Sequence, residues 1–111
     1  MMTVNDIVKA LKLTVYSAKD SLSNEVDGAY VSDLLSDVMG NAKEGQIWIT
    51  LQTHKNILAV AGLKDLPAII LVQGLQPDQD TLKKAEEEKI PVLGTSLDTF
   101  TISGKLYELL K

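Results

Sequence analysis

The five residues Ala68-Ile69-Ile70-Leu71-Val72 form an unbroken aliphatic run in a chain of 111 residues. A continuous apolar run of this length is typical of a central strand that is buried on both of its faces. The run is far too short to cross a membrane, so it does not indicate a transmembrane segment. It therefore predicts a sheet that is covered by helices on both sides. The neighbouring segments are expected to form the other strands and these helices.

Two further strands are predicted before and after this run, at Gln46–Thr50 and Pro91–Gly94. In the first of them, Ile47 and Ile49 share one face and Trp48 lies on the other. Trp48 belongs either to the core or to an outer face, where it would anchor a partner protein. The connections between the strands are short, and the middle strand is wholly apolar, which favours parallel pairing with right-handed crossovers.

The same half of the chain predicts three helices, over Thr53–Ala61, from Pro77 to about Lys89, and from a cap at Thr95 or Ser96 to Leu110. Gly62 is placed to end the first helix. Pro77 suits the first turn of the second helix, because a missing N–H costs nothing there. The residues expected to point inward are Ile57, Val60, Ala61, Leu82 and Ala85.

The first half predicts a helix over Thr3–Leu11, with Thr3 as the cap and Asp6 in the acidic position of a capping box. After it we expect a strand at Leu13–Tyr16, a polar loop at Ser17–Gly28 and a short strand at Ala29–Val31. Ser32 or Asp33 then caps a short helix that Gly40 ends in the left-handed conformation. The apolar face of that helix is expected to consist of Leu34, Leu35, Val38 and Met39.

These elements together predict an α/β fold, a three-layer α/β/α sandwich with about five strands, mostly parallel in the second half. The length fits one domain, and no linker, repeat or low-complexity tract interrupts it. We therefore expect residues 1–111 to form a single α/β domain.

The charge balance is acidic, with 15 Asp and Glu residues against 11 basic residues, all of them lysine. Proteins that bind nucleic acid show basic faces and favour arginine for bidentate contacts, so no nucleic-acid role is expected. The chain has no cysteine and one histidine, which excludes disulfides, thiolate zinc sites and cysteine-ligated clusters. No metal site or cofactor is predicted.

Neither a G-x-G-x-x-G fingerprint nor a G-x-x-x-x-G-K-[ST] loop occurs in the chain. No nucleophile with an orienting base and acid can be assigned from spacing, so we do not predict an enzyme. Met1–Ala10 lacks a basic region followed by an apolar run, and therefore does not resemble a secretory signal. A cytoplasmic protein is expected, without membrane association.

The carboxyl ends of parallel strands are the preferred place for a ligand in an open α/β sheet, and each of them leads into a helix N-terminus that favours an anion. The candidate ligand-binding residues there are Thr50, Gln52, Thr53, His54, Gln73, Gly74, Thr95 and Ser96. Simpler roles compete: Thr53 and Ser96 as helix caps, Gly74 as a turn residue with positive φ, and His54 as a structural or exposed side chain.

Asp33 and Asp37 lie four residues apart on the short predicted helix. Two carboxylates so placed can hold a cation or perform acid–base chemistry, although on a helix they more often form a solvated face. Nothing else in the sequence completes a site around them.

Several stretches of the sequence, by their order and spacing, resemble the DRTGG domain family, which is related to the N-terminal domain of HPr kinase/phosphorylase. They are GAYVSDLLSDVMGNA (Gly28–Ala42), QIWITLQTHKNILAVA (Gln46–Ala61), AIILVQG (Ala68–Gly74), Pro77–Ala85, Ile90–Leu93 and Thr99–Leu109. One departure is clear. After a strand ending in Ile-Thr the family motif carries a Gly-Asp-Arg-type turn, whereas here Leu51 and Gln52-Thr53-His54 follow Thr50.

The resemblance implies a non-catalytic regulatory or dimerising module, an accessory partner in an anaerobic metabolic or hydrogenase complex. Our leading hypothesis is therefore a homodimer that acts through protein contacts. A second hypothesis is a sensor that binds a small anion or an adenine nucleotide at the strand ends. An enzyme is the third and least favoured hypothesis.

Overall fold

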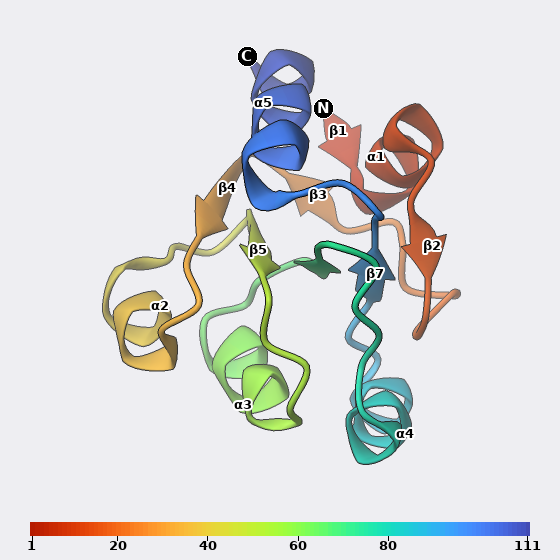
Figure 1. Ribbon diagram of the computed structural model, residues 1–111, viewed down its shortest axis with the longest axis vertical. Coiled ribbons are helices and arrows are strands. Elements are labelled where there is room, and N and C mark those ends of the chain that lie inside the picture. The colour runs from red at the N-terminus through yellow and green to blue at the C-terminus, as the bar shows by residue number, and fades with distance from the viewer.

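The computed structural model describes residues 1–111 as seven strands and five helices (Figure 1). The strands are β1 (Met2–Thr3), β2 (Thr14–Val15), β3 (Glu25–Val26), β4 (Gly28–Val31), β5 (Gln46–Thr50), β6 (Ile69–Leu71) and β7 (Val92–Gly94). The helices are α1 (Val4–Leu11), α2 (Leu35–Asn41), α3 (Asn56–Leu63), α4 (Gln79–Glu88) and α5 (Thr99–Leu110).

The main sheet has five strands in the order β2-β7-β6-β5-β4. The four strands from β4 to β7 pair in parallel, and β2 joins β7 antiparallel at one edge. In the middle of the sheet, Ile69 of β6 lies between Trp48 of β5 and Val92 of β7. The predicted α/β fold with a mostly parallel five-stranded sheet is confirmed.

Each face of the sheet is covered by its own helices, which gives three layers. Ile47, Ile49 and Ile70 pack with α1 and α5 into one buried cluster, while Trp48 and Ile69 pack with α2, α3 and α4 into a second one. Figure 1 shows α1 and α5 above the sheet and the other three helices below it. This alternation is the period of two that the sequence of β5 predicts.

Trp48 belongs to the core, which decides between the two roles left open for it. Its side chain is completely buried, and its indole N–H donates a hydrogen bond of 2.8 Å to the carbonyl of Ser32. Burial of a large side chain of this kind contributes about 1.5–3 kcal/mol to folding, provided that its polar atom keeps a partner.

The capping box at the start of α1 is confirmed. The backbone N–H of Asp6 donates to Thr3 Oγ1 at 3.2 Å, and the backbone N–H of Thr3 donates to Asp6 Oδ2 at 2.9 Å. The backbone N–H of Thr3, and after it the Thr3 side chain, hold the pKa of the Asp6 carboxyl below its usual value, because hydrogen bonds to the carboxylate favour the charged form.

The predicted ends of the later helices are wrong in several places. Gly40 and Gly62 lie inside α2 and α3, and the left-handed residue after α3 is Asp65, with φ of 54°. Aspartate tolerates this conformation better than most residues, so no glycine is required there. α5 starts after Asp98 instead of Thr95 or Ser96, because the loop that follows β7 is longer than predicted.

The predicted inward faces of α2 and α4 also need correction. Leu34 and Met39 of the predicted α2 face and Leu82 of α4 are exposed, whereas Thr81 and Ala85 are buried. A threonine can take the inward position in α4 because its hydroxyl donates to the carbonyl of Thr53 at 2.8 Å. The hydroxyl thereby avoids the cost of burial without a hydrogen bond.

The segment Ser17–Gly28, predicted as a loop, contains β3, which pairs antiparallel with β1. The partners are Met2 with Val26 and Thr3 with Glu25. Strands of two residues are too short to show a periodic pattern. Their pairing depends on tertiary contacts, so the local sequence does not predict it.

Ser17 is expected to be an important residue for stability. It is completely buried, and its Oγ donates to the carbonyl of Ile90 at 2.8 Å and accepts from the N–H of Val92 at 2.9 Å. Ser17→Ala should lower the free energy of unfolding by about 1–3 kcal/mol, because two backbone groups lose their partner. Chemical denaturation measures this loss.

Ser36→Ala, at an exposed position of α2, is the matched control and should change the free energy of unfolding by less than about 0.5 kcal/mol. Equal stabilities for the two variants would contradict the role given to Ser17.

Candidate functional site

All eight residues of the predicted ligand site lie at the carboxyl edge of the sheet, at the end of β5 and in the loops after β5, β6 and β7. The fold therefore brings the three predicted segments to one edge, as parallel pairing requires. The hydrogen bonds that their polar groups form show what each of them does there.

Thr50 takes part in a hydrogen-bond network that joins the loop after β5 to the loop after β4. Its hydroxyl donates to Asp33 Oδ1 at 2.9 Å, and Asp33 Oδ1 also accepts from the N–H of Leu51 at 2.7 Å. The amide of Gln52 donates to the carbonyl of Asp33 at 2.9 Å. Thr50 is almost completely buried, so its hydroxyl stabilises the two loops and is not exposed to a ligand.

Thr53 and His54 hold the next connection in place. The carbonyl of Thr53 accepts from the N–H of Asp78 at 3.2 Å, which ties this loop to the start of α4. The imidazole of His54 is exposed, and its Nδ1 accepts from the backbone N–H of Asn56 at 3.1 Å, where α3 begins. His54 thus satisfies a helix-start N–H, and Thr53 does not form the predicted side-chain cap.

Gln73, Gly74, Thr95 and Ser96 lie in the two loops that follow β6 and β7. Gln73 and Gly74 both have positive φ, at 59° and 72°, which bears out the turn interpretation of Gly74. The N–H of Gly74 donates to the carbonyl of Thr95 at 2.8 Å, so the two loops are bound to each other. Ser96 is exposed beside them.

The carboxyl edge carries several carboxylates and few cations. Asp33, Asp78 and Asp98 stand before α2, α4 and α5, and Lys55 is the one lysine in these loops. The backbone N–H of Thr101, and then its side chain, lower the pKa of Asp98 by hydrogen bonding to the charged form. A carboxylate therefore occupies the helix N-terminus where an anionic ligand would bind. The five main cavities of the structure are lined by other residues.

Asp33 and Asp37, considered above as a carboxylate pair, belong to separate networks. Asp37 accepts hydrogen bonds from the Tyr30 hydroxyl at 2.8 Å and from the Asn41 amide at 3.0 Å. The bond to Asp37 raises the pKa of Tyr30, because it favours the protonated phenol. The structure contains no group of three His, Cys, Asp or Glu side chains that could hold a metal ion.

Asp33→Ala should lower the free energy of unfolding by about 1–2 kcal/mol, because the buried Thr50 hydroxyl and the Leu51 N–H both lose their acceptor. Thermal or chemical denaturation measures the effect. Asp20→Ala, at an exposed loop position, is the control and should be close to neutral. Equal free energies of unfolding for the two variants would show that the hydrogen bonds of Asp33 do not stabilise the fold.

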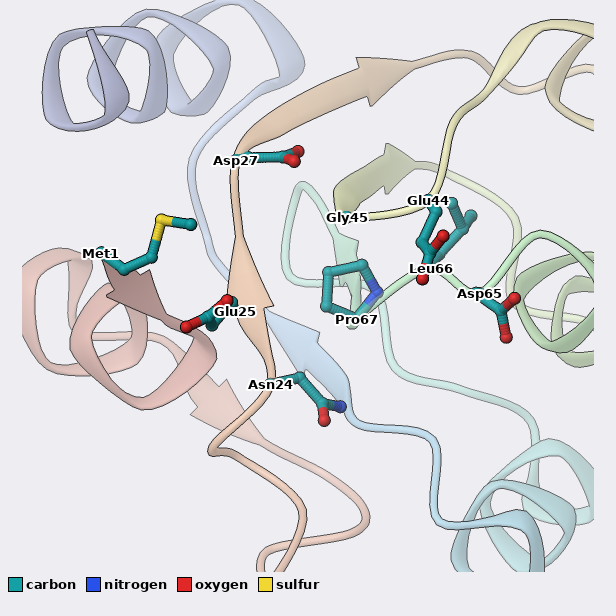
Figure 2. A pocket seen from close by; sticks show the side chains of 9 residues that line it. All are labelled: Met1, Asn24, Glu25, Asp27, Glu44, Gly45, Asp65, Leu66 and Pro67. Carbon is teal, nitrogen blue, oxygen red and sulfur yellow. The ribbon is translucent and has the colours of Figure 1, made fainter.

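The largest cavity lies at the opposite, amino edge of the sheet and has a volume of 620 Å³ (Figure 2). It is lined by four carboxylates, those of Glu25, Asp27, Glu44 and Asp65. Figure 2 shows the Glu25 and Asp65 carboxylates pointing away from each other, so they do not converge on one point. The cavity is an acidic hollow in the surface and not a built cation site.

An exposed apolar surface lies between the edge strand β4 and helix α5. We define this β4–α5 surface by Ala29, Val31, Phe100, Ser103, Gly104 and Tyr107. They line a groove of 530 Å³ together with Asp27, Gly28, Ile49, Leu110 and Lys111. Phe100 is 88% exposed and Tyr107 is 69% exposed. Two aromatic side chains thus stand in solvent beside an uncovered strip of the sheet.

The prediction from sequence did not include this surface, although a signal for it exists. Ile102 and Leu106 are the buried residues of α5, and Phe100 and Tyr107 lie seven residues apart on another side of the same helix. One of the two apolar stripes faces the core, and the other has no partner within the chain.

The sequence of the chain matches the family model of the DRTGG domain over residues 6–109. The chain belongs to the DRTGG domain family. The match spans nearly all of the elements described above, from α1 to the end of α5.

Two known proteins are similar to this DRTGG domain. HPr kinase/phosphorylase of Levilactobacillus brevis is 29% identical over 125 residues, covering 99% of the chain and 40% of the relative. The fold resembles the crystal structure of the CBS and DRTGG domains of the regulatory region of Clostridium perfringens pyrophosphatase, complexed with the activator diadenosine tetraphosphate. That likeness has a TM-score of 0.68 at 18% identity and covers 92% of this chain and 44% of the other.

The chain therefore spans less than half the length of each of these proteins. In addition, none of its helices is both long enough and apolar enough to cross a membrane.

Proposed function

We propose that this DRTGG domain is a non-catalytic regulatory module that acts through protein contacts, and that it forms a homodimer through the β4–α5 surface. The observation that carries the proposal is the exposure of Phe100 and Tyr107 beside an apolar groove. Val31, in the edge strand below them, is 47% exposed. A contiguous apolar patch on a small protein marks an interaction surface, because its exposure to water is unfavourable.

The non-catalytic part of the proposal is supported by the use of the polar side chains at the carboxyl edge. Thr50 and the Nδ1 atom of His54 are engaged in hydrogen bonds that hold loops and a helix start. In the two similar proteins, the matched region is a minor part of a longer chain, and the pyrophosphatase match is to a regulatory region. The accessory role in an anaerobic or hydrogenase complex belongs to the same proposal, and affinity purification from the native organism tests it.

Phe100→Asp should convert the dimer to a monomer, because it places a charge in the middle of the apolar contact. Analytical ultracentrifugation over a range of concentrations measures the change, and we expect the dissociation constant to rise by at least about 100-fold, as for a dominant interface residue.

Leu63→Asp provides the matched control, because Leu63 is 71% exposed at the end of α3, on the other side of the sheet. This variant should keep the oligomeric state of the wild type. A wild-type protein that stays monomeric at the highest concentration tested contradicts the proposal.

The alternative function is a sensor that binds a small anion or an adenine nucleotide at the carboxyl edge. Its support is the position of the eight candidate residues at the strand ends, and the diadenosine tetraphosphate bound by the similar pyrophosphatase region. On this alternative, AMP, ATP or diadenosine tetraphosphate should raise the melting temperature, because a ligand that binds only the folded state stabilises it.

His54→Ala should reduce this shift, whereas Lys83→Ala, on the exposed side of α4, should leave it unchanged. Thermal denaturation with each nucleotide at millimolar concentration measures both. If none of the three nucleotides shifts the melting temperature, the alternative is excluded for this class of ligand.

A further inference from the structure

The geometry points to a specific arrangement of the dimer, an inference that rests on the proposed function. We propose that the α5 helices of two copies pack antiparallel and cross between Ser103 and Gly104. In the same arrangement the β4 edges of the two copies pair antiparallel, so that the sheet continues through the dimer. The partner that fits the β4–α5 surface is therefore a second copy of this chain.

The outward stripe of α5 is complementary to itself. Phe100, Ser103, Gly104 and Tyr107 follow one another at the spacing of one helix face, with two small residues between two aromatic ones. If two such helices cross antiparallel midway between Ser103 and Gly104, Phe100 of each copy lies opposite Tyr107 of the second copy. Nothing lies within 4 Å of the position that a side chain on Gly104 would take, so the centre is open for a close approach.

The edge of β4 offers the matching contact in the sheet. β4 is the outermost strand, and its parallel partner β5 turns the backbone groups of Ile47 and Ile49 toward it, as the bond from the Ser32 N–H to the carbonyl of Ile49 shows. In this register Gly28 and Tyr30 bond to β5, and by alternation the N–H and carbonyl groups of Ala29 and Val31 point outward. An edge of this kind is a template for another strand, and proteins usually cover it.

The two contacts are compatible with each other in their dimensions. Because α5 contacts both β4 and β5, its axis lies over that pair of strands. Pairing of β4 with β4 then places the two α5 axes about two strand spacings apart, or about 10 Å. Packed helices have the same separation, about 8–10 Å. One two-fold axis perpendicular to the sheet therefore satisfies both contacts.

Charge also favours a second copy. Asp98 caps the start of α5, and Lys111, whose ammonium lies 3.1 Å from the Glu108 carboxylate, follows its end. An antiparallel pair places the acidic start of each helix near the basic residue at the end of the other.

Cysteine cross-linking tests the helix crossing, because the natural chain has no cysteine. Gly104→Cys should form a disulfide-linked dimer under mild oxidation, with most of the protein cross-linked. Phe100→Cys and Tyr107→Cys proteins, mixed in equal amounts, should form a disulfide-linked heterodimer, because these two exposed positions face each other in the arrangement, and they cover the case in which the glycine variant folds poorly. Gly62→Cys is the matched control: this glycine is also exposed, helical and unobstructed, and its variant should stay uncross-linked.

Amide hydrogen exchange tests the strand contact. In the wild-type dimer the N–H groups of Ala29 and Val31 should exchange at least about tenfold more slowly than in the monomeric Phe100→Asp variant, because pairing buries them in a ladder. Equal exchange rates overturn the continuous sheet.

The outcomes separate this arrangement from the proposed function. A dimer in ultracentrifugation that is cross-linked neither by Gly104→Cys nor by the mixed Phe100→Cys and Tyr107→Cys proteins overturns the crossing of α5 and leaves the proposed homodimer intact. A strict monomer overturns both. A cross-linked dimer with protected Ala29 and Val31 amides supports the complete arrangement.

Discussion

The parallel ladder that joins β6 to β5 on one side and to β7 on the other carries both hydrophobic clusters. Residues of β6 alternate between the clusters, with Ile70 in the one below α1 and α5, and Ile69 and Leu71 in the other. A slip of one residue in the register would exchange these side chains between the two faces. The helices, the loops at the carboxyl edge and the exposed edge of β4 all take their positions from this register.

The parts of the fold that the sequence predicts are those with a local signal of sufficient length. The aliphatic run at Ala68–Val72 and the alternation in Gln46–Thr50 correspond to buried strands, and Thr3 with Asp6 forms its capping box. The errors have a different origin. Thr95 and Ser96 resemble caps by residue type, but the loop length decides that Asp98 performs this role. The β1–β3 pair depends on the meeting of segments more than twenty residues apart, which no local pattern reveals.

The candidate site shows the same limit in functional terms. Parallel pairing predicts that Thr50, Gly74 and Ser96 come to one edge, and they do. Whether a polar group at that edge is available to a ligand depends on its neighbours, such as the Asp33 carboxylate that accepts from Thr50. Similarly, Phe100 and Tyr107 become an exposed surface only because Ile102 and Leu106 occupy the core side of α5. Exposure is a property of the assembled layers, and a single helix sequence does not specify which of two apolar stripes will be covered.

The position of β2 has a consequence for how the molecule is made. Thr14 and Val15, near the start of the chain, pair with Gly94 and Leu93, and Val4 and Ile7 of α1 share a cluster with Ile102 and Leu106 of α5. On the ribosome, β2 therefore has no partner strand until β7 has been made, and α1 lacks its contacts with α5 until that helix follows, whereas β1 finds β3 early. The contacts between the two ends of the domain are of the non-local kind that forms slowly, because a long loop must close before they gain anything.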